Sequence, residues 1–127
     1  MTWIEARVNC SVDAAWITLR EMLVSDIKRW ADLTKADGPT VAQEGNRVIV
    51  AFPGAAGESP DRWATIEKNG VQITVRHFHP GDAEKVGTFR LIPRLNRQDA
   101  QCRLWIGEQE LEFWQVCCRI LEPILFP

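Results

Sequence analysis

The chain has 127 residues, 46% of them hydrophobic, and it contains six Trp, five Phe and no Tyr. This is enough apolar material for one packed core but too short a chain for two, so we predict a single domain over residues 1–127 and exclude an intrinsically disordered chain. The formal net charge of -2 argues against a nucleic-acid-binding protein, whose affinity for phosphates requires a basic excess.

The N-terminal residues predict a strand that leads directly into a helix. Apolar and polar residues alternate over residues 2–10, which is typical of a half-buried strand. Ser11 then suits a helix N-cap, and the carboxylate of Asp13 complements the dipole of the first turn. Apolar side chains recur every three or four residues from Val12 to Trp30, so we predict an amphipathic helix with one face on a sheet.

The middle of the chain predicts three β-hairpins, because short apolar segments flank turn-forming residues. Asn69-Gly70 is the strongest of these turn signals. Together with the first strand, the hairpins predict about seven strands. The hairpins pair residues 41–43 with 47–52, 63–67 with 71–79, and 89–95 with 102–106.

A second helix closes the chain. Apolar residues again recur every three or four positions from Glu108, and Pro123 predicts an end near Leu121, because the residue before a proline disfavours the helical conformation. The apolar tail 124–127 suggests docking onto the body of the protein or onto a partner. We therefore predict an α+β fold, in which a curved antiparallel sheet of about six or seven strands carries an N-terminal and a C-terminal helix on its concave face.

Cysteine usage and terminal sequence predict a cytoplasmic protein without a membrane span. The N-terminus lacks a signal-peptide pattern, and the apolar stretches are shorter than the roughly 20 residues that a span requires. We expect buried free thiols, with the last two cysteines facing the core, and we expect no zinc site, because the spacing does not fit one. The cysteines are Cys10, Cys102, Cys117 and Cys118.

The two histidines, His77 and His79, continue the inward face of their strand by alternation. The segment from Gly70 to Gly87, which includes Glu84, resembles part of the first cupin motif, whose His, His and Glu side chains bind a metal. Its spacing departs from that motif at both ends. We therefore expect no metal and no cofactor, and we keep pocket lining and hydrogen-bonded strand-end histidines as the alternatives.

Charge is distributed unevenly in the C-terminal third. Basic side chains outnumber the single Asp99 between residues 85 and 107, whereas glutamates dominate the segment 108–122. Two solvated faces of opposite sign explain this pattern, and an anionic partner is the alternative. The basic residues are Lys85, Arg90, Arg94, Arg97 and Arg103.

The segment Val8-Asn9-Cys10-Ser11-Val12-Asp13-Ala14-Ala15-Trp16 and the order of elements resemble the START-like or polyketide-cyclase superfamily (helix-grip fold). In that superfamily a curved sheet wraps a long C-terminal helix around a cavity. No catalytic motif is recognisable, so we predict a non-catalytic binding protein. The resemblance implies that a hydrophobic small molecule binds between the sheet and the last helix, and ordinary core packing of the same residues is the alternative. The residues that it implies as lining are Phe52, Ile73, Val75, His77, Leu91, Leu104, Trp114 and Cys118.

A second hypothesis is a small bacterial interaction protein, such as an inhibitor, immunity or accessory factor. Trp3, Trp63 and Trp105 face outward by alternation, and exposed Trp side chains together with divided charge are typical of protein-binding surfaces. Its partner would be another protein or a second copy of the chain. An enzyme that uses His77, His79 and Glu84 is a weaker hypothesis, because no catalytic motif is recognisable.

Overall fold

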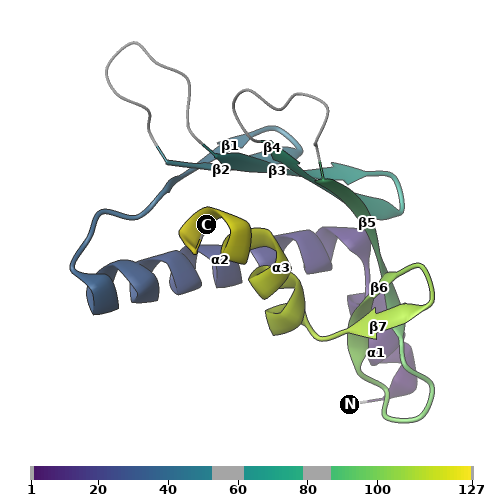
Figure 1. Cartoon of the computed structure of the whole chain (residues 1–127). Coiled ribbons are helices and arrows are strands. Elements are labelled where there is room, and N and C mark those ends of the chain that lie inside the picture. The colour runs from purple at the N-terminus through teal and green to yellow at the C-terminus, as the bar shows by residue number, and fades with distance from the viewer. Residues whose placement is uncertain (1, 53–61, 79–86, 127) are drawn as a thin grey trace.

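In the computed structural model of the chain, residues 2–52, 62–78 and 87–126 are described. Within these ranges the chain forms three helices and seven strands, and the sheet arches over α2 and α3 (Figure 1). The helices are α1 (Trp3–Asn9), α2 (Val12–Thr34) and α3 (Phe113–Leu125). The strands are β1 (Thr40–Glu44), β2 (Arg47–Ala51), β3 (Trp63–Asn69), β4 (Gln72–Phe78), β5 (Gly87–Leu95), β6 (Cys102–Ile106) and β7 (Gln109–Leu111).

The sheet is a meander in which each strand pairs antiparallel with the next one along the chain, from β1 to β7. All three predicted hairpins are confirmed, and Asn69 lies opposite Gln72 across a two-residue turn. Gly70 begins that turn with φ 58°, the left-handed conformation that glycine adopts at little cost. The predicted α+β class, with a curved antiparallel sheet and helices at both ends of the chain, is therefore confirmed.

The strand predicted over residues 2–10 is wrong, because this segment forms the short helix α1. Thr2 caps the helix by accepting a hydrogen bond from the Glu5 backbone N–H at 3.2 Å. Ala6 and Cys10 are buried one helical turn apart, whereas Ile4 and Val8 face solvent. An apolar residue at every second position also places residues i and i+4 on one helix face, so alternation over nine residues fits both structures.

The seventh strand, β7, comes from residues that were expected to begin the closing helix. That helix starts at Phe113 instead of Glu108. Glu112 is its N-cap, and the Gln115 side chain accepts a hydrogen bond from the Glu112 backbone N–H at 2.8 Å. The helix also continues past Pro123 to Leu125, so the predicted end near Leu121 is wrong. Pro123 lacks a backbone N–H, but the helix still continues for two residues beyond it.

The core fills the space between the concave face of the sheet and the two longer helices. Alternate residues of β2 to β6 point into it, and α2 contributes a stripe spaced by three or four residues, as predicted. The buried cluster consists of Ala15, Trp16, Leu19, Leu23, Ile27, Val48, Val50, Ala64, Ile66, Ile73, Val75, Leu91, Leu104, Leu111, Val116, Cys117, Ile120, Leu121 and Ile124.

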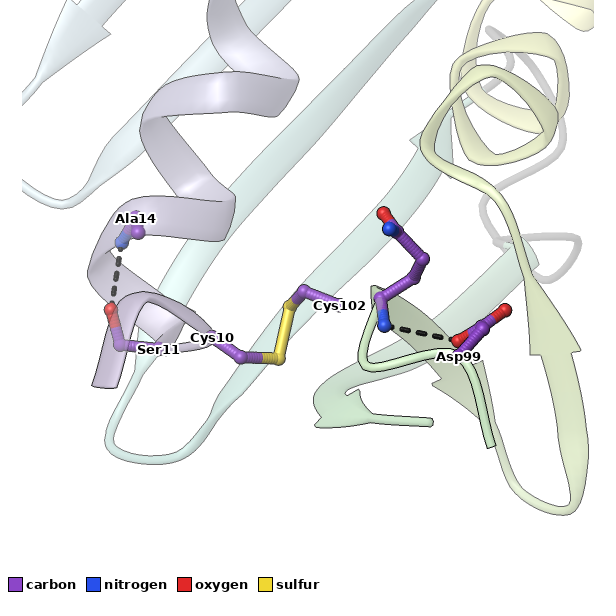
Figure 2. Close-up of a disulfide and its surroundings, with 6 residues drawn as sticks. Cys10, Ser11, Ala14, Asp99 and Cys102 are labelled. Atoms are coloured by element: carbon purple, nitrogen blue, oxygen red, sulfur yellow. Dashed lines mark hydrogen bonds between the residues drawn. A yellow bond between two sulfur atoms is a disulfide. The ribbon is translucent and has the colours of Figure 1, made fainter. Parts of the chain in front are cut away.

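A disulfide bond joins Cys10 to Cys102, 92 residues apart in the sequence (Figure 2). The expectation of free thiols is wrong for these two residues, because the helical turn of α1 presents Cys10 to β6. Cys117 and Cys118 are free, but only Cys117 is buried, so the core-facing position expected for Cys118 is wrong too. Within the described residues, none of the helices is both long enough and apolar enough to cross a membrane.

Candidate functional site

Four of the predicted lining residues meet in the interior. Ile73, Val75, Leu91 and Leu104 come from three neighbouring strands and are 0% exposed. They belong to the same packed cluster as α3 residues such as Ile120, so their neighbours include the protein's own side chains. Alternation along each strand was a sufficient signal for their burial.

Phe52 and His77 lie at the margin of this interior. Phe52 is partly buried and meets Trp30 edge to face, with ring centroids 6.0 Å apart. His77 is buried, and its Nε2 atom is 2.9 Å from the backbone carbonyl oxygen of Ile120. This hydrogen bond ties β4 to α3.

Of the side chains that resemble the His, His and Glu ligands of the cupin motif, the structure describes only His77. His79 and Glu84 lie outside the described residues. Among the residues that the structure does describe, no group of three or more His, Cys, Asp or Glu side chains is placed to hold a metal ion. The one described histidine, His77, bonds to backbone instead.

Trp114 and Cys118 do not join the interior, because both side chains are exposed on the outer side of α3. There they line a groove of about 560 Å³ between α2 and α3, which we call the α2/α3 groove. Three large apolar side chains around it project into solvent, with exposed fractions of 60 to 67%. Those three are Leu33, Trp114 and Phe126.

Both helices carry a second apolar stripe that produces this groove. On α2, Trp30 and Leu33 lie about one turn apart, away from the core stripe that ends at Ile27. On α3, Val116 and Ile120 face the core, whereas Trp114 and neighbouring residues face the groove. The apolar arc of α3 is wider than one packing face, and this width is the signal in the sequence that could have identified the groove.

Charged groups border the apolar floor of the groove. Asp26 and Arg29 come from α2 and Glu122 comes from α3, so the rim carries two carboxylates and one guanidinium. Burial raises the pKa of the Cys117 thiol to about 12, with smaller contributions from Asp26 and Cys118. Cys117 is therefore a neutral thiol in the floor, and the groove carries a net negative rim.

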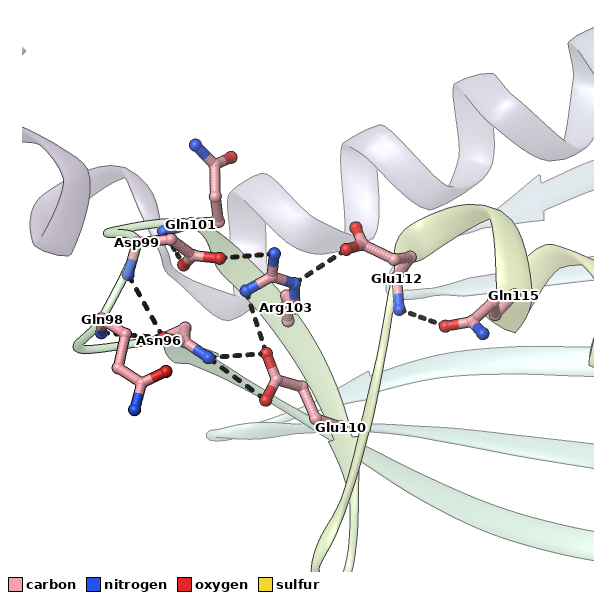
Figure 3. A network of polar contacts seen from close by, with 8 residues as sticks. All are labelled: Asn96, Gln98, Asp99, Gln101, Arg103, Glu110, Glu112 and Gln115. Carbon is pink, nitrogen blue, oxygen red and sulfur yellow. Dashed lines mark hydrogen bonds and ion pairs between the residues drawn. The ribbon is translucent and has the colours of Figure 1, made fainter.

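The basic segment 85–107 is partly neutralised by its neighbours (Figure 3). Arg103 forms ion pairs with Asp99 at 2.6 Å, Glu110 at 3.0 Å and Glu112 at 2.8 Å. Its hydrogen bond to Asp99, followed by a backbone hydrogen bond from Gln101, lowers the pKa of the Asp99 carboxyl. Arg103 is therefore a structural hub that joins β6 to β7 and to the start of α3.

The three Trp expected to face outward behave differently. Trp3 projects from α1 and is 68% exposed, whereas Trp63 and Trp105 are partly buried. Trp63 stacks on Phe78 with ring centroids 4.9 Å apart, and Trp105 lies beneath the Arg94 guanidinium at 5.9 Å. Of these three, only Trp3 on α1 is largely exposed, and it does not line the α2/α3 groove.

The comparisons with family models, curated proteins and solved structures found no match for this chain. The resemblance to the START-like superfamily therefore stays a prediction. The local transition on which it depends runs from one helix into another at Cys10 and Ser11, instead of from a strand.

Proposed function

We propose that this chain is a non-catalytic binding protein whose α2/α3 groove docks an apolar segment of a partner protein. The observation that carries the proposal is the gathering of Leu33, Trp114 and Phe126 around one groove, each at least 60% exposed. Contiguous exposed apolar surface on a soluble protein marks an interaction site. Tryptophan is also enriched among the residues that dominate binding energy.

A protein segment fits this surface better than a small molecule does. Small-molecule sites enclose about 70–90% of the ligand surface. The large side chains of this groove instead project into solvent and would not enclose a small ligand. An amphipathic helix or an apolar loop would cover them from outside. A hydrophobic small molecule is the second candidate, because the volume of about 560 Å³ lies within the range of ligand sites.

The charges on the rim of the groove indicate which charges the docked segment should carry. Asp26 and Glu122 outweigh Arg29 by one negative charge. Opposite charges across an interface favour the correct orientation and speed association. We therefore expect the docked segment to combine an apolar face with at least one flanking Lys or Arg.

Site-specific photo-cross-linking tests the proposal. A photoreactive amino acid replaces Leu33, which projects at the groove, and in a control protein it replaces Val71, which is exposed in the hairpin turn between β3 and β4. We expect a discrete protein adduct from position 33 in extracts of the source cells. Excess wild-type chain should compete for the partner and suppress the adduct. Excess of a chain that carries Trp114→Ala and Phe126→Ala should leave the adduct unchanged.

The mass of the adduct distinguishes the alternatives. An adduct of twice the chain's mass identifies a second copy as the occupant, and a mass increment below that of any peptide supports a small molecule. Equal cross-linking from positions 33 and 71, or no adduct at position 33, contradicts the proposal. The substituted side chains are largely exposed, so these proteins should fold.

A further inference from the structure

A second hollow, of about 720 Å³, lies between α1 and the segment that joins β5 to β6. Arg7 from α1 and Arg94 and Arg97 from the other wall line it, with Trp3 at the same wall as Arg7. None of the described residues that line it is acidic. We call this hollow, defined by Trp3, Arg7, Arg94 and Arg97, the arginine cleft.

Among the described residues, the three guanidinium groups of the cleft lack an ion-pair partner, and that of Arg94 lies over the Trp105 ring. Within residues 2–52, 62–78 and 87–126, no carboxylate oxygen lies within ion-pairing distance of Arg7, Arg94 or Arg97. Arg103, by contrast, is surrounded by three carboxylates. Cations that share a hollow repel one another, so a bound anion would lower the energy of the cleft.

Both walls of the cleft are held in place. The disulfide between Cys10 and Cys102 ties the end of α1 to β6, about one helical turn from Arg7 (Figure 2). On the other wall, the Asn96 Oδ1 atom accepts hydrogen bonds from the backbone N–H of Gln98, at 2.8 Å, and of Asp99 (Figure 3). A site that is already ordered loses less entropy when a ligand binds.

The fourth member of the cleft adds an apolar contact. Trp3 is 68% exposed, and an indole ring in that state offers a free face on which a planar ring can stack. Guanidinium groups match phosphate oxygens with paired hydrogen bonds. The combination of three guanidinium groups and one open indole therefore selects an anion that carries a planar ring.

We propose that the arginine cleft binds a nucleoside phosphate, with the phosphates on Arg7, Arg94 and Arg97 and the base against Trp3. A small ligand of this class needs only local positive charge, whereas a long nucleic acid would meet a chain of net charge -2. The site is separate from the α2/α3 groove, since none of the described residues lines both.

Isothermal titration calorimetry of the oxidised protein with ADP, pyrophosphate and adenosine tests the site. We expect ADP to bind saturably, pyrophosphate to bind more weakly and adenosine not to bind. Arg94→Gln or Arg97→Gln should weaken ADP binding by about tenfold each, because each removes a charge-assisted contact. Trp3→Ala should remove the preference for ADP over pyrophosphate.

Arg47→Gln is the matched control. Arg47 is an exposed arginine of β2, near the opposite edge of the sheet, and its substitution should leave ADP binding unchanged. Absence of saturable ADP binding overturns the proposal. So does equal weakening by Arg47→Gln and Arg94→Gln, which would indicate diffuse charge attraction, or binding of adenosine as tight as that of ADP.

Discussion

Two adjacent cysteines show how strongly position on one helix decides chemistry. Cys117 is buried in the floor of the α2/α3 groove, whereas Cys118 faces solvent on the same turn of α3. Only a thiolate reacts as a nucleophile, and burial raises the pKa of Cys117 to about 12. The two neighbours should therefore differ in reactivity by a large factor.

Alkylation of the folded, unreduced protein measures this difference. With iodoacetamide at about pH 8, we expect modification of Cys118 and protection of Cys117, because the buried thiol stays protonated. Intact-mass and peptide-mass spectrometry locate the label, and the denatured protein serves as the control in which both thiols react. Rapid labelling of Cys117 in the folded chain would contradict its burial.

At the scale of elements, α3 carries two apolar faces with different energetic roles. Ile120 is fully buried against the sheet, and its own backbone carbonyl oxygen accepts the hydrogen bond from His77. Trp114 lies roughly 120° around the helix from Ile120, and its side chain is 60% exposed. One face therefore stabilises the fold, and the other is free for binding.

Two alanine substitutions separate the two faces. Ile120→Ala should lower the free energy of unfolding by about 2–5 kcal/mol, because it leaves a cavity in a packed core. Trp114→Ala should cost less than about 1 kcal/mol, since most of its surface is in water already in the folded state. Urea denaturation of both proteins measures the costs, and a larger cost for Trp114→Ala would contradict this assignment of faces.

The disulfide acts on the whole molecule. It connects the N-terminal helix to a strand near the end of the sheet, across a sequence separation of 92 residues. Such a link restricts the unfolded chain, and this effect grows with the length of the closed loop. Disulfides persist mainly in oxidising compartments, and the cytoplasmic location expected from the sequence stays a prediction.

Removal of the disulfide should lower the free energy of unfolding by about 2–5 kcal/mol. Urea denaturation with and without reductant measures the loss, and the double substitution Cys10→Ser and Cys102→Ser should reproduce it. Reductant should then have no further effect on the doubly substituted protein. An equal effect of reductant on both proteins would show that the Cys10–Cys102 bond is not the cause.

The sequence predicted the elements whose patterns are long or carry turn signals. The three hairpins, the helix α2 and the burial of residues such as Ile73 and Leu91 followed from periodicity, because side chains alternate along any strand and repeat every 3.6 residues along any helix. The strand predicted from alternation over residues 2–10 is wrong, because an alternating pattern over nine residues also places apolar side chains on one face of a helix.

For the candidate sites, the sequence marked Trp114, Cys118 and the basic segment, but it assigned the first two to the interior. Only the tertiary structure decided which apolar face of α3 meets the sheet and that Cys10 meets Cys102. It also decided that Arg103 forms ion pairs, whereas Arg94 and Arg97 form none with the described residues. These outcomes depend on contacts between residues far apart in the chain. Local periodicity carries information about a residue's neighbours along its own element, and none about which distant element will cover it.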